Sequence, residues 1–397
     1  MNEEPKTQVI VEAFPAENGD CLLVSHKDCH ILIDTGYEET YKKYLLPRFV
    51  GLKKDGHQLS RLIITHIDQD HIHGAIPLIK DNGRADQNNI IPIKQVWHNS
   101  YRHLNKGEEK TEISVEGEQL LERLKTSGSS INQEVSFRQG SSLAADLLSG
   151  NYAWNTDFDQ GPVKTPCEPI TIADGVQITL LSPTEEKLEK LEKYWKRELK
   201  RIGFKDNFGK NDLFDDAYEF LILKEKDSNP VIEETPASSS VLSFDTLYGK
   251  TISEDKRPSN GSSIAFVLEM NKKKLLFLGD SHPSVILSSL KSIYGDEPLQ
   301  FDFIKISHHG SYYNSNLDLL NFIDASKYCI STDGLGHHPN LETLCWIVGR
   351  PTNFKRTICF NYKHSGVTFL ENLAWKTQYN YTLDYPQQEG ESLKILI

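Results

Sequence analysis

Short apolar runs bounded by turn residues organise the opening of the chain. The turn signal Asn18-Gly-Asp20 separates the first two runs, and residues 74–80 have the apolar spacing of a helix. An alternating or β-branched composition predicts strands at residues 7–14, 21–25, 30–33 and 61–65. Strands that give way to helices are typical of an α/β (α+β) protein.

The same pattern returns in the second half of the chain. Apolar runs predict strands at residues 170–181 (two short strands around a turn), 263–268, 274–278, 303–306 and 328–331. Helical spacing follows at residues 285–294, 317–323 and 341–348. Residues 356–362 begin further strands that we expect to close the fold.

Two polar stretches interrupt this scaffold. We expect a single domain over residues 1–397, with insertions at about 101–165 and 184–259. The first insertion has helical patterns at residues 115–125 and 143–148. The second begins with an amphipathic helix that runs to about Arg201, for which Ser182 is the expected N-cap and Pro183 the first helical residue. Residues 224–259 are rich in Ser, Glu and Pro, which favours a mobile loop or a lid.

Composition excludes some classes of protein. The apolar runs are too short to cross a bilayer, and the first residues lack the basic and apolar regions of a signal peptide, so we expect no membrane span and a cytoplasmic location. The six scattered cysteines favour reduced core thiols. A net charge of −12 argues against a surface that binds nucleic acid non-specifically, but it does not exclude a local basic channel.

The candidate chemistry begins in the segment T-H-I-D-Q-D-H-I-H-G. If its backbone is extended, His66, Asp68 and Asp70 project to one face, and His71 follows at once. The segment comes directly after the strand at residues 61–65, where α/β proteins usually build their sites. Histidine and carboxylate side chains at this spacing predict a metal site.

Further acids and histidines each stand just past a predicted strand. They are Asp34, Asp280, His308, His309, His337 and His338, in a chain with fourteen histidines. Chance clustering is a poor explanation, so we expect a centre with two divalent metal ions. For Asp34 the residues leave two alternatives, a helix cap or a carboxylate that orients a metal-bound histidine. His98, His103 and His73 are expected to be structural or loop histidines.

Taken together, Asp34, H-I-D-Q-D-H-I-H-G, F-L-G-D, S-H-H-G-S and G-H-H-P-N resemble the metallo-β-lactamase superfamily. Among its members they resemble soluble relatives of the hydrolase domain of the DNA-uptake protein ComEC. The resemblance implies a four-layer αββα sandwich. It also implies that His66 and Asp68 bind one ion, that Asp70, His71 and His338 bind the other, and that Asp280 bridges them. His308 and His309 line the same pocket, one as a metal ligand, for which we name His309, and one as proton donor or phosphate contact, and their roles stay open.

Two departures from the family pattern concern the first ion. Asp68 stands where the commoner motif has histidine, and Asn260 lies where a further histidine is usual and would act as a weak ligand or hydrogen-bond donor. An oxygen-rich site accepts manganese or magnesium as well as zinc. We therefore expect two divalent ions, Zn²⁺ or Mn²⁺, with Mg²⁺ as a further option.

The resemblance implies a hydrolase that activates a water molecule with its metal ions. Asp70 would position the water or take its proton, and His308 or His309 would stabilise charge or protonate the leaving group. A phosphodiester in a nucleotide or nucleic acid fits best, which makes a phosphodiesterase or nuclease the expected activity. The alternatives are hydrolysis of a lactone, thioester or β-lactam, and an effector of bacterial defence that is active only with a protein partner.

Overall fold

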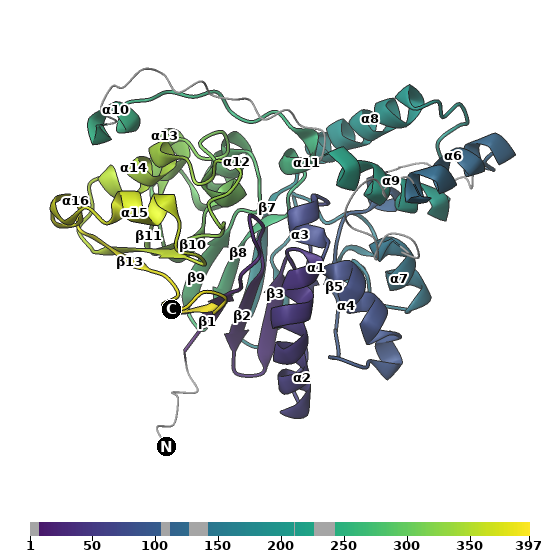
Figure 1. Cartoon of the computed structure of the whole chain (residues 1–397), viewed down its shortest axis with the longest axis horizontal. Coiled ribbons are helices and arrows are strands. Elements are labelled where there is room, and N and C mark those ends of the chain that lie inside the picture. Colours follow the sequence, from purple (N-terminus) through teal and green to yellow (C-terminus); the bar gives the residue numbers. More distant parts are fainter. Residues whose placement is uncertain (1–7, 105–111, 127–141, 210, 226–242) are drawn as a thin grey trace.

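Two β-sheets pack face to face and carry helices on both outer faces (Figure 1). The computed structural model describes residues 8–104, 112–126, 142–209, 211–225 and 243–397. The layers run helix, sheet, sheet, helix, so the predicted four-layer αββα sandwich is confirmed.

The first sheet contains the N-terminal strands and closes with a strand from the far end of the chain. Side chains on its strands alternate between two apolar cores: Leu22 and Val24 face the other sheet, whereas Leu23 faces the helices. This period of two buries both faces of the sheet. The strand order is β14 (Leu393–Leu396), β1 (Ile10–Ala13), β2 (Leu22–His26), β3 (Cys29–Ile33), β4 (Arg61–Ile63) and β5 (Val96–Trp97).

The second sheet is larger and holds the predicted strands of the C-terminal half. Phe266 and Leu268 point to the inter-sheet core, and Val267 between them points to the outer helices. The strand order is β13 (Tyr381–Asp384), β12 (Arg356–Phe360), β11 (Ile323–Ile330), β10 (Leu299–Lys305), β9 (Lys273–Phe277), β8 (Ala265–Met270), β7 (Val176–Ser182) and β6 (Ile170–Ala173). The strands from β9 to β13 are parallel, so their carboxyl ends share one edge.

The outer helices cover both sheets. The first sheet is covered by α1 (Glu38–Thr40), which continues through a π-helical turn (Tyr41–Leu45) into α2 (Leu46–Lys54), and by α4 (Ala75–Asn82). The second sheet is covered by α12 (Pro283–Tyr294), α13 (Leu317–Phe322), α14 (Leu341–Gly349), α15 (Ser365–Leu370) and α16 (Leu373–Gln378). Four of the outer helices, α4, α12, α13 and α14, lie where the apolar spacing predicts them, whereas α15 and α16 interrupt the C-terminal stretch in which only further strands were expected.

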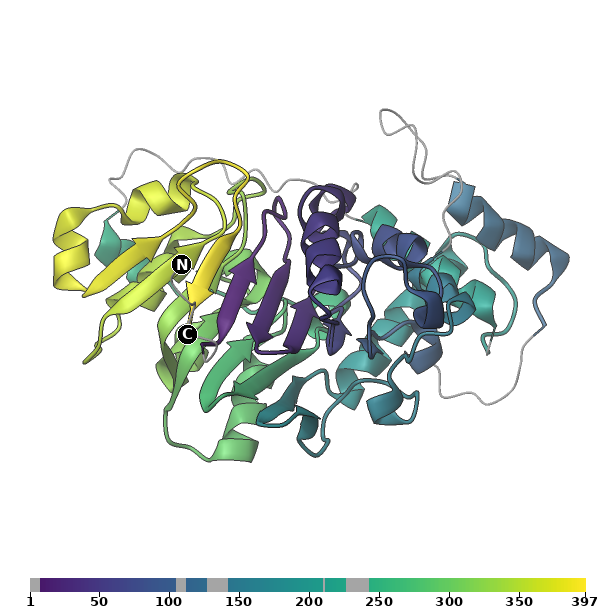
Figure 2. The same cartoon turned by 90° about the horizontal axis from the view of Figure 1, so that it is seen from below.

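The two predicted insertions pack against each other as a helical lobe at one end of the sandwich (Figure 2). Its helices are α5 (Tyr101–Leu104), α6 (Val115–Thr126), α7 (Leu143–Ser149), α8 (Glu185–Arg201) and α9 (Asp212–Glu225). The amphipathic helix α8 begins later than we expected. Thr184, and not Ser182, is its N-cap, because the Thr184 side chain accepts the backbone N–H of Lys187.

The segment 224–259, predicted as a mobile loop or a lid, is only partly described, since residues 226–242 lie outside the described part of the chain. Helix α10 (Phe244–Tyr248) packs on α14, far from the lobe, and the following segment runs back to α11 (Pro258–Gly261) (Figure 1).

All six cysteines are free thiols, five of them buried, as predicted. None of the helices in the described ranges combines the length and hydropathy that a membrane span requires.

Candidate metal centre

The loop after β4 carries the first group of candidate ligands. Its backbone is not extended as far as we expected: Asp68 is the N-cap of a short helix, α3 (Gln69–Ile72). His66 and Asp68 therefore precede the helix, and Asp70 and His71 lie in its first turn. The helix turns His71 back toward the end of β3, because the backbone N–H of Thr35 donates to the His71 carbonyl at 2.9 Å.

Asp34, directly after β3, orients His71 directly and His66 through Thr65. Its carboxylate accepts the Thr65 backbone N–H at 2.7 Å, the Thr65 hydroxyl at 2.7 Å and His71 Nδ1 at 2.8 Å. Because the Thr65 hydroxyl donates to Asp34, it can accept from His66 Nδ1, 3.1 Å away. Both rings then carry hydrogen on Nδ1 and turn Nε2 toward the cluster. Burial opposes protonation of His71, but the charges of Asp280 and Asp34 raise its pKa well above the usual value, so a metal ion at its Nε2 would replace a proton. Of the two roles expected for Asp34, the structure favours the orienting carboxylate.

Asparagine at position 34 is expected to weaken metal binding without removing a ligand. Its amide can replace only one of the two carboxylate oxygens as an acceptor, so the His71 ring loses its fixed orientation. Substitution of such an orienting group typically costs about 10–100-fold in metal affinity. Titration of Asp34→Asn with a competing metal chelator measures the change, and an affinity equal to that of the wild type would contradict this role.

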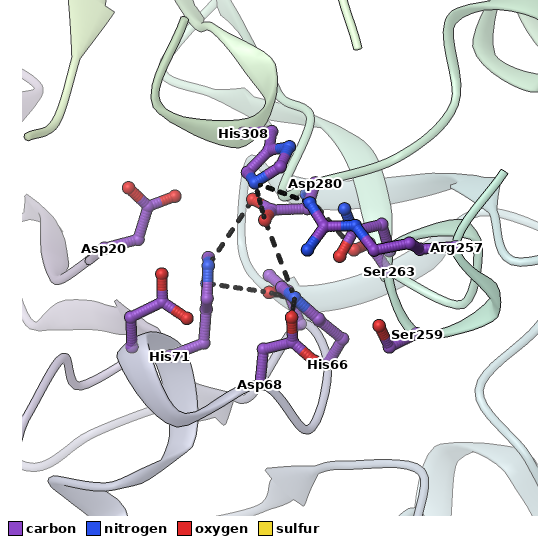
Figure 3. A network of polar contacts seen from close by, with 12 residues as sticks. Asp20, His66, Asp68, His71, Arg257, Ser259, Ser263, Asp280 and His308 are labelled. Carbon is purple, nitrogen blue, oxygen red and sulfur yellow. Dashed lines mark hydrogen bonds and ion pairs between the residues drawn. The ribbon is translucent and has the colours of Figure 1, made fainter. Parts of the chain in front are cut away.

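Asp280 lies at the centre of the cluster (Figure 3). One carboxylate oxygen is 3.4 Å from His71 Nε2, and the other is 3.7 Å from His66 Nε2 and 3.6 Å from His308 Nε2. Burial alone would raise the pKa of Asp280, but attraction to the His308 and His71 rings in their protonated forms holds it well below its usual range. A buried carboxylate that faces several rings suits the predicted bridge between two ions.

The backbone around Asp280 is shaped to present this carboxylate. Gly279 has a positive φ of 50° and lies against Ser263 and Thr65, where a Cβ would come within 3.2 Å of the Ser263 Cβ. The Ser263 hydroxyl accepts the Asp280 backbone N–H at 3.1 Å. Strand β9 thus ends in a tight turn that directs Asp280 into the cluster.

His309 joins the centre from the end of β10. Its Nε2 is 3.2 Å from an Asp70 oxygen, and its Nδ1 contacts the Ser331 carbonyl at 2.9 Å and Asp20 Oδ1 at 3.3 Å. Burial opposes protonation, but the charges of Asp20 and Asp280 raise the pKa of His309 to about 9. A metal ion at Nε2 would therefore compete with a proton.

A buried ion pair stabilises Asp20, the carboxylate that contacts His309 Nδ1. The ammonium group of Lys305 lies 2.6 Å from Asp20 Oδ2, and both side chains are almost completely buried. Lys305 also donates to the Ile306 carbonyl at 2.9 Å. Asp20 is thereby shared between Lys305 and His309, which links the turn after β1 to the end of β10.

His308 faces a different set of partners. Its Nδ1 is 2.7 Å from Asn314 Oδ1, and its Nε2 is 3.2 Å from Arg257 Nη2. Burial lowers the pKa of His308 to about 4, which outweighs the opposing charge of Asp280. The ring is neutral near pH 7, with its Nε2 lone pair toward Arg257 and Asp280.

The cluster fits metal ions because several buried polar atoms meet there without a hydrogen-bond partner: His66 Nε2, His71 Nε2 and both carboxylate oxygens of Asp280. Such atoms are costly unless a ligand satisfies them. Among the described residues, donor atoms lie within 4.8 Å of one another in three groups: His66–His71–Asp280 and Asp70–His71–His309, which hold predicted ligands, and Asp20–Asp34–His71. The first two groups share His71, whose Nε2 lone pair can serve only one ion, whereas the two oxygens of Asp280 could each face an ion.

The remaining predicted residues lie around this cluster. Asp68 Oδ2 is 3.7 Å from His66 Nε2. The His338 ring centroid is 5.0 Å from that of His308, outside the two groups, so its role as a ligand stays a prediction. Buried Asn260 donates to Asp255 at 2.6 Å and stays a predicted neighbour of the first ion. His337 is exposed.

The other histidines set aside as structural are found away from the two groups. His73 is the C-cap of α3, with its ring 6.4 Å from that of Tyr37. The His98 ring stacks on Trp154 at 6.0 Å, and the His103 ring meets Trp154 edge-on at 4.6 Å, beside the helical lobe.

The structure brings four further residues to the centre: Lys305, Arg257 and Asn314, for which no role was predicted, and Asp20, which was expected only as a turn residue. One signal was available for Lys305. It is the single charge in the apolar run at residues 303–306, and a charge on a buried strand needs a partner. Arg257 and Asn314 lie in polar segments, where nothing distinguishes them from solvated residues.

Comparison with known proteins supports the fold. Residues 15–83, which include Asp34 and the loop from His66 to His71, match the model of the metallo-beta-lactamase superfamily. No curated protein matches the chain.

Two solved structures are similar over most of this chain. The first is a mutant of the β-hydroxylase CmlA, with a TM-score of 0.32 and 9% identity, covering 100% of this chain and 55% of that one. The second is a protein of unknown function from Enterococcus faecalis, with a TM-score of 0.30 and 8% identity, covering 96% of this chain and 78% of that one. The chain thus spans about half the length of the CmlA structure.

The layers, the site and the family match together define a protein of the metallo-β-lactamase fold. The predicted resemblance to that superfamily is confirmed over residues 15–83, while the likeness to ComEC relatives stays a prediction. The match and the candidate metal-binding groups support a metal-dependent hydrolase.

Proposed function

We propose that the chain is a phosphodiesterase or nuclease that uses two divalent metal ions. The observation that carries this proposal is the buried Asp280 carboxylate, one of whose oxygens faces His71 Nε2 and the other His66 Nε2, so that an ion could bind at each oxygen. Two ions about 3.5–4 Å apart would lower the pKa of a bound water and offset the charge of both the attacked group and the leaving oxygen. A phosphodiester carries negative charge at both places.

The chain's own residues have separate tasks in this proposal. Asp70, which accepts from Asn18 Nδ2 at 3.3 Å and lies beside His309, would orient the attacking water and accept its proton. His308 presents an acceptor at Nε2, because Arg257 can only donate. Because this Nε2 carries no hydrogen, the arrangement favours His308 as a metal ligand over His308 as a proton donor or phosphate contact.

A substrate panel tests the proposal. The chain, purified without a metal-binding tag and stripped of metal, is reloaded separately with Mn²⁺, Zn²⁺ and Mg²⁺, then assayed with bis-nitrophenyl phosphate, single-stranded DNA, RNA and a lactone. We expect phosphodiester hydrolysis that depends on added metal and little lactone hydrolysis. Lactone hydrolysis without phosphodiester hydrolysis would contradict the proposal.

A third result would point to a partner. If the reloaded chain binds metal fully but hydrolyses no member of the panel, the phosphodiesterase proposal fails for the isolated chain. The partner-gated effector would then account better for an intact centre without activity.

A further inference from the structure

Arg257 stands at the rim of the candidate metal centre, just before α11. Figure 3 shows its guanidinium group directed toward His308 and Asp280. The side chain is 42% exposed, so one part of it contacts the centre while another part is open to solvent. A cation in this position can meet a molecule that enters the site.

The direction of the hydrogen bonds around Arg257 follows from Asn314. The Asn314 amide nitrogen donates to the Asp280 carbonyl at 2.9 Å and to Asp255 at 3.1 Å, so its oxygen is the atom that faces His308 Nδ1. His308 must donate there, which leaves Nε2 as the acceptor for Arg257. This contact uses one of the five guanidinium N–H groups.

The backbone that carries Arg257 is anchored to the loop that carries His308. Asp255 Oδ1 accepts the Arg257 backbone N–H at 2.9 Å, and the Asp255 backbone N–H donates to the Tyr313 carbonyl at 2.9 Å. Asn260 also donates to Asp255. Arg257 is thus held close to its working position before any ligand binds, which reduces the entropy lost on binding.

Asp255 does not saturate the guanidinium. Its Oδ1 is 3.6 Å from Arg257 Nε, beyond hydrogen-bond distance and not in a two-pronged arrangement. A planar guanidinium with free N–H groups matches two oxygens of one phosphate group. The acidic side chains of the centre, by contrast, would repel a phosphate that met no cation.

We infer that Arg257 binds the non-bridging oxygens of the substrate's phosphate group beside the metal centre. This inference rests on the proposed function, which it deepens by adding an anion subsite made by the chain itself.

Three variants test the subsite. Arg257→Gln removes the charge, Arg257→Lys keeps the charge but loses the planar fork, and Lys256→Gln removes an exposed neighbouring charge as the matched control. Each Mn²⁺-loaded variant is titrated with inorganic phosphate by calorimetry, assayed with bis-nitrophenyl phosphate, and analysed for bound metal.

For Arg257→Gln we expect phosphate affinity to fall about tenfold or more and KM to rise by a similar factor, with metal content unchanged. The phosphate affinity and KM of Arg257→Lys should lie between those of Arg257→Gln and the wild type. Both values should be unchanged in Lys256→Gln. Equal phosphate affinity in Arg257→Gln and wild type would overturn the inference, as would loss of metal from Arg257→Gln, because Arg257 would then support the centre itself.

The measurements distinguish a failure of the Arg257 phosphate subsite from a failure of the proposed phosphodiesterase activity. If the wild type binds phosphate through Arg257 but hydrolyses no phosphodiester, the subsite stands and the proposed activity fails. If the metal-loaded wild type binds no phosphate, the subsite is wrong.

Discussion

Asparagine or alanine at position 280 is expected to remove both metal ions and to abolish hydrolysis. Asp280 is fully buried, its two oxygens have no hydrogen-bond partner, and they lie within 3.7 Å of His66 and His71. A neutral side chain cannot balance two divalent ions in this buried position, so neither is retained. Elemental analysis of the purified variants, with bis-nitrophenyl phosphate hydrolysis measured on the same samples, checks both effects.

Two controls separate this effect from general damage. Asp296→Asn makes a matched change at a side chain that is 90% exposed, and it should keep metal and activity. His103→Ala, in the helical lobe, should keep both as well. A full complement of metal in an Asp280 variant would refute the bridging role.

Methionine at position 305 is expected to cause the largest loss of stability. Lys305 and Asp20 form an ion pair with side chains only 2% exposed, joining parts of the chain that are 285 residues apart. Removing one partner of a buried pair leaves an uncompensated charge and costs about 3–5 kcal/mol. Urea unfolding of Lys305→Met and wild type, both in excess chelator so that metal affinity does not contribute, measures the difference.

The double variant Lys305→Met, Asp20→Asn tests whether the loss comes from the unpaired charge. It should be more stable than the sum of the single changes predicts, because neither charge is left alone. A loss below about 1 kcal/mol in Lys305→Met would contradict the account.

Lys305 and His309 lower the pKa of Asp20 despite its burial, so the stability that this carboxylate contributes is present above pH about 4 and lost as the pH falls.

Much of the centre could be predicted because its signals are local. Asp34 and Asp280 each follow a buried strand within a few residues, and the loop from His66 to His71 is continuous in sequence. Parallel strands bring their carboxyl ends to one edge, so residues that are far apart in the chain meet there.

The remainder depends on contacts that no local pattern encodes. Arg257 reaches His308 only because the segment after α10 runs back across the molecule to α11. The N-cap of α8 is Thr184 and not the predicted Ser182, a difference of two residues that capping propensity alone does not resolve. His309 lies in a donor group and His338 does not, a difference that depends on the conformation of two loops.

Anomalous diffraction from crystals of the Mn²⁺-loaded chain shows directly whether the centre holds two metal ions. We predict two anomalous peaks about 3.5–4 Å apart, one beside His66 and one beside His309, with Asp280 between them. A single peak, or peaks away from these residues, would contradict the account.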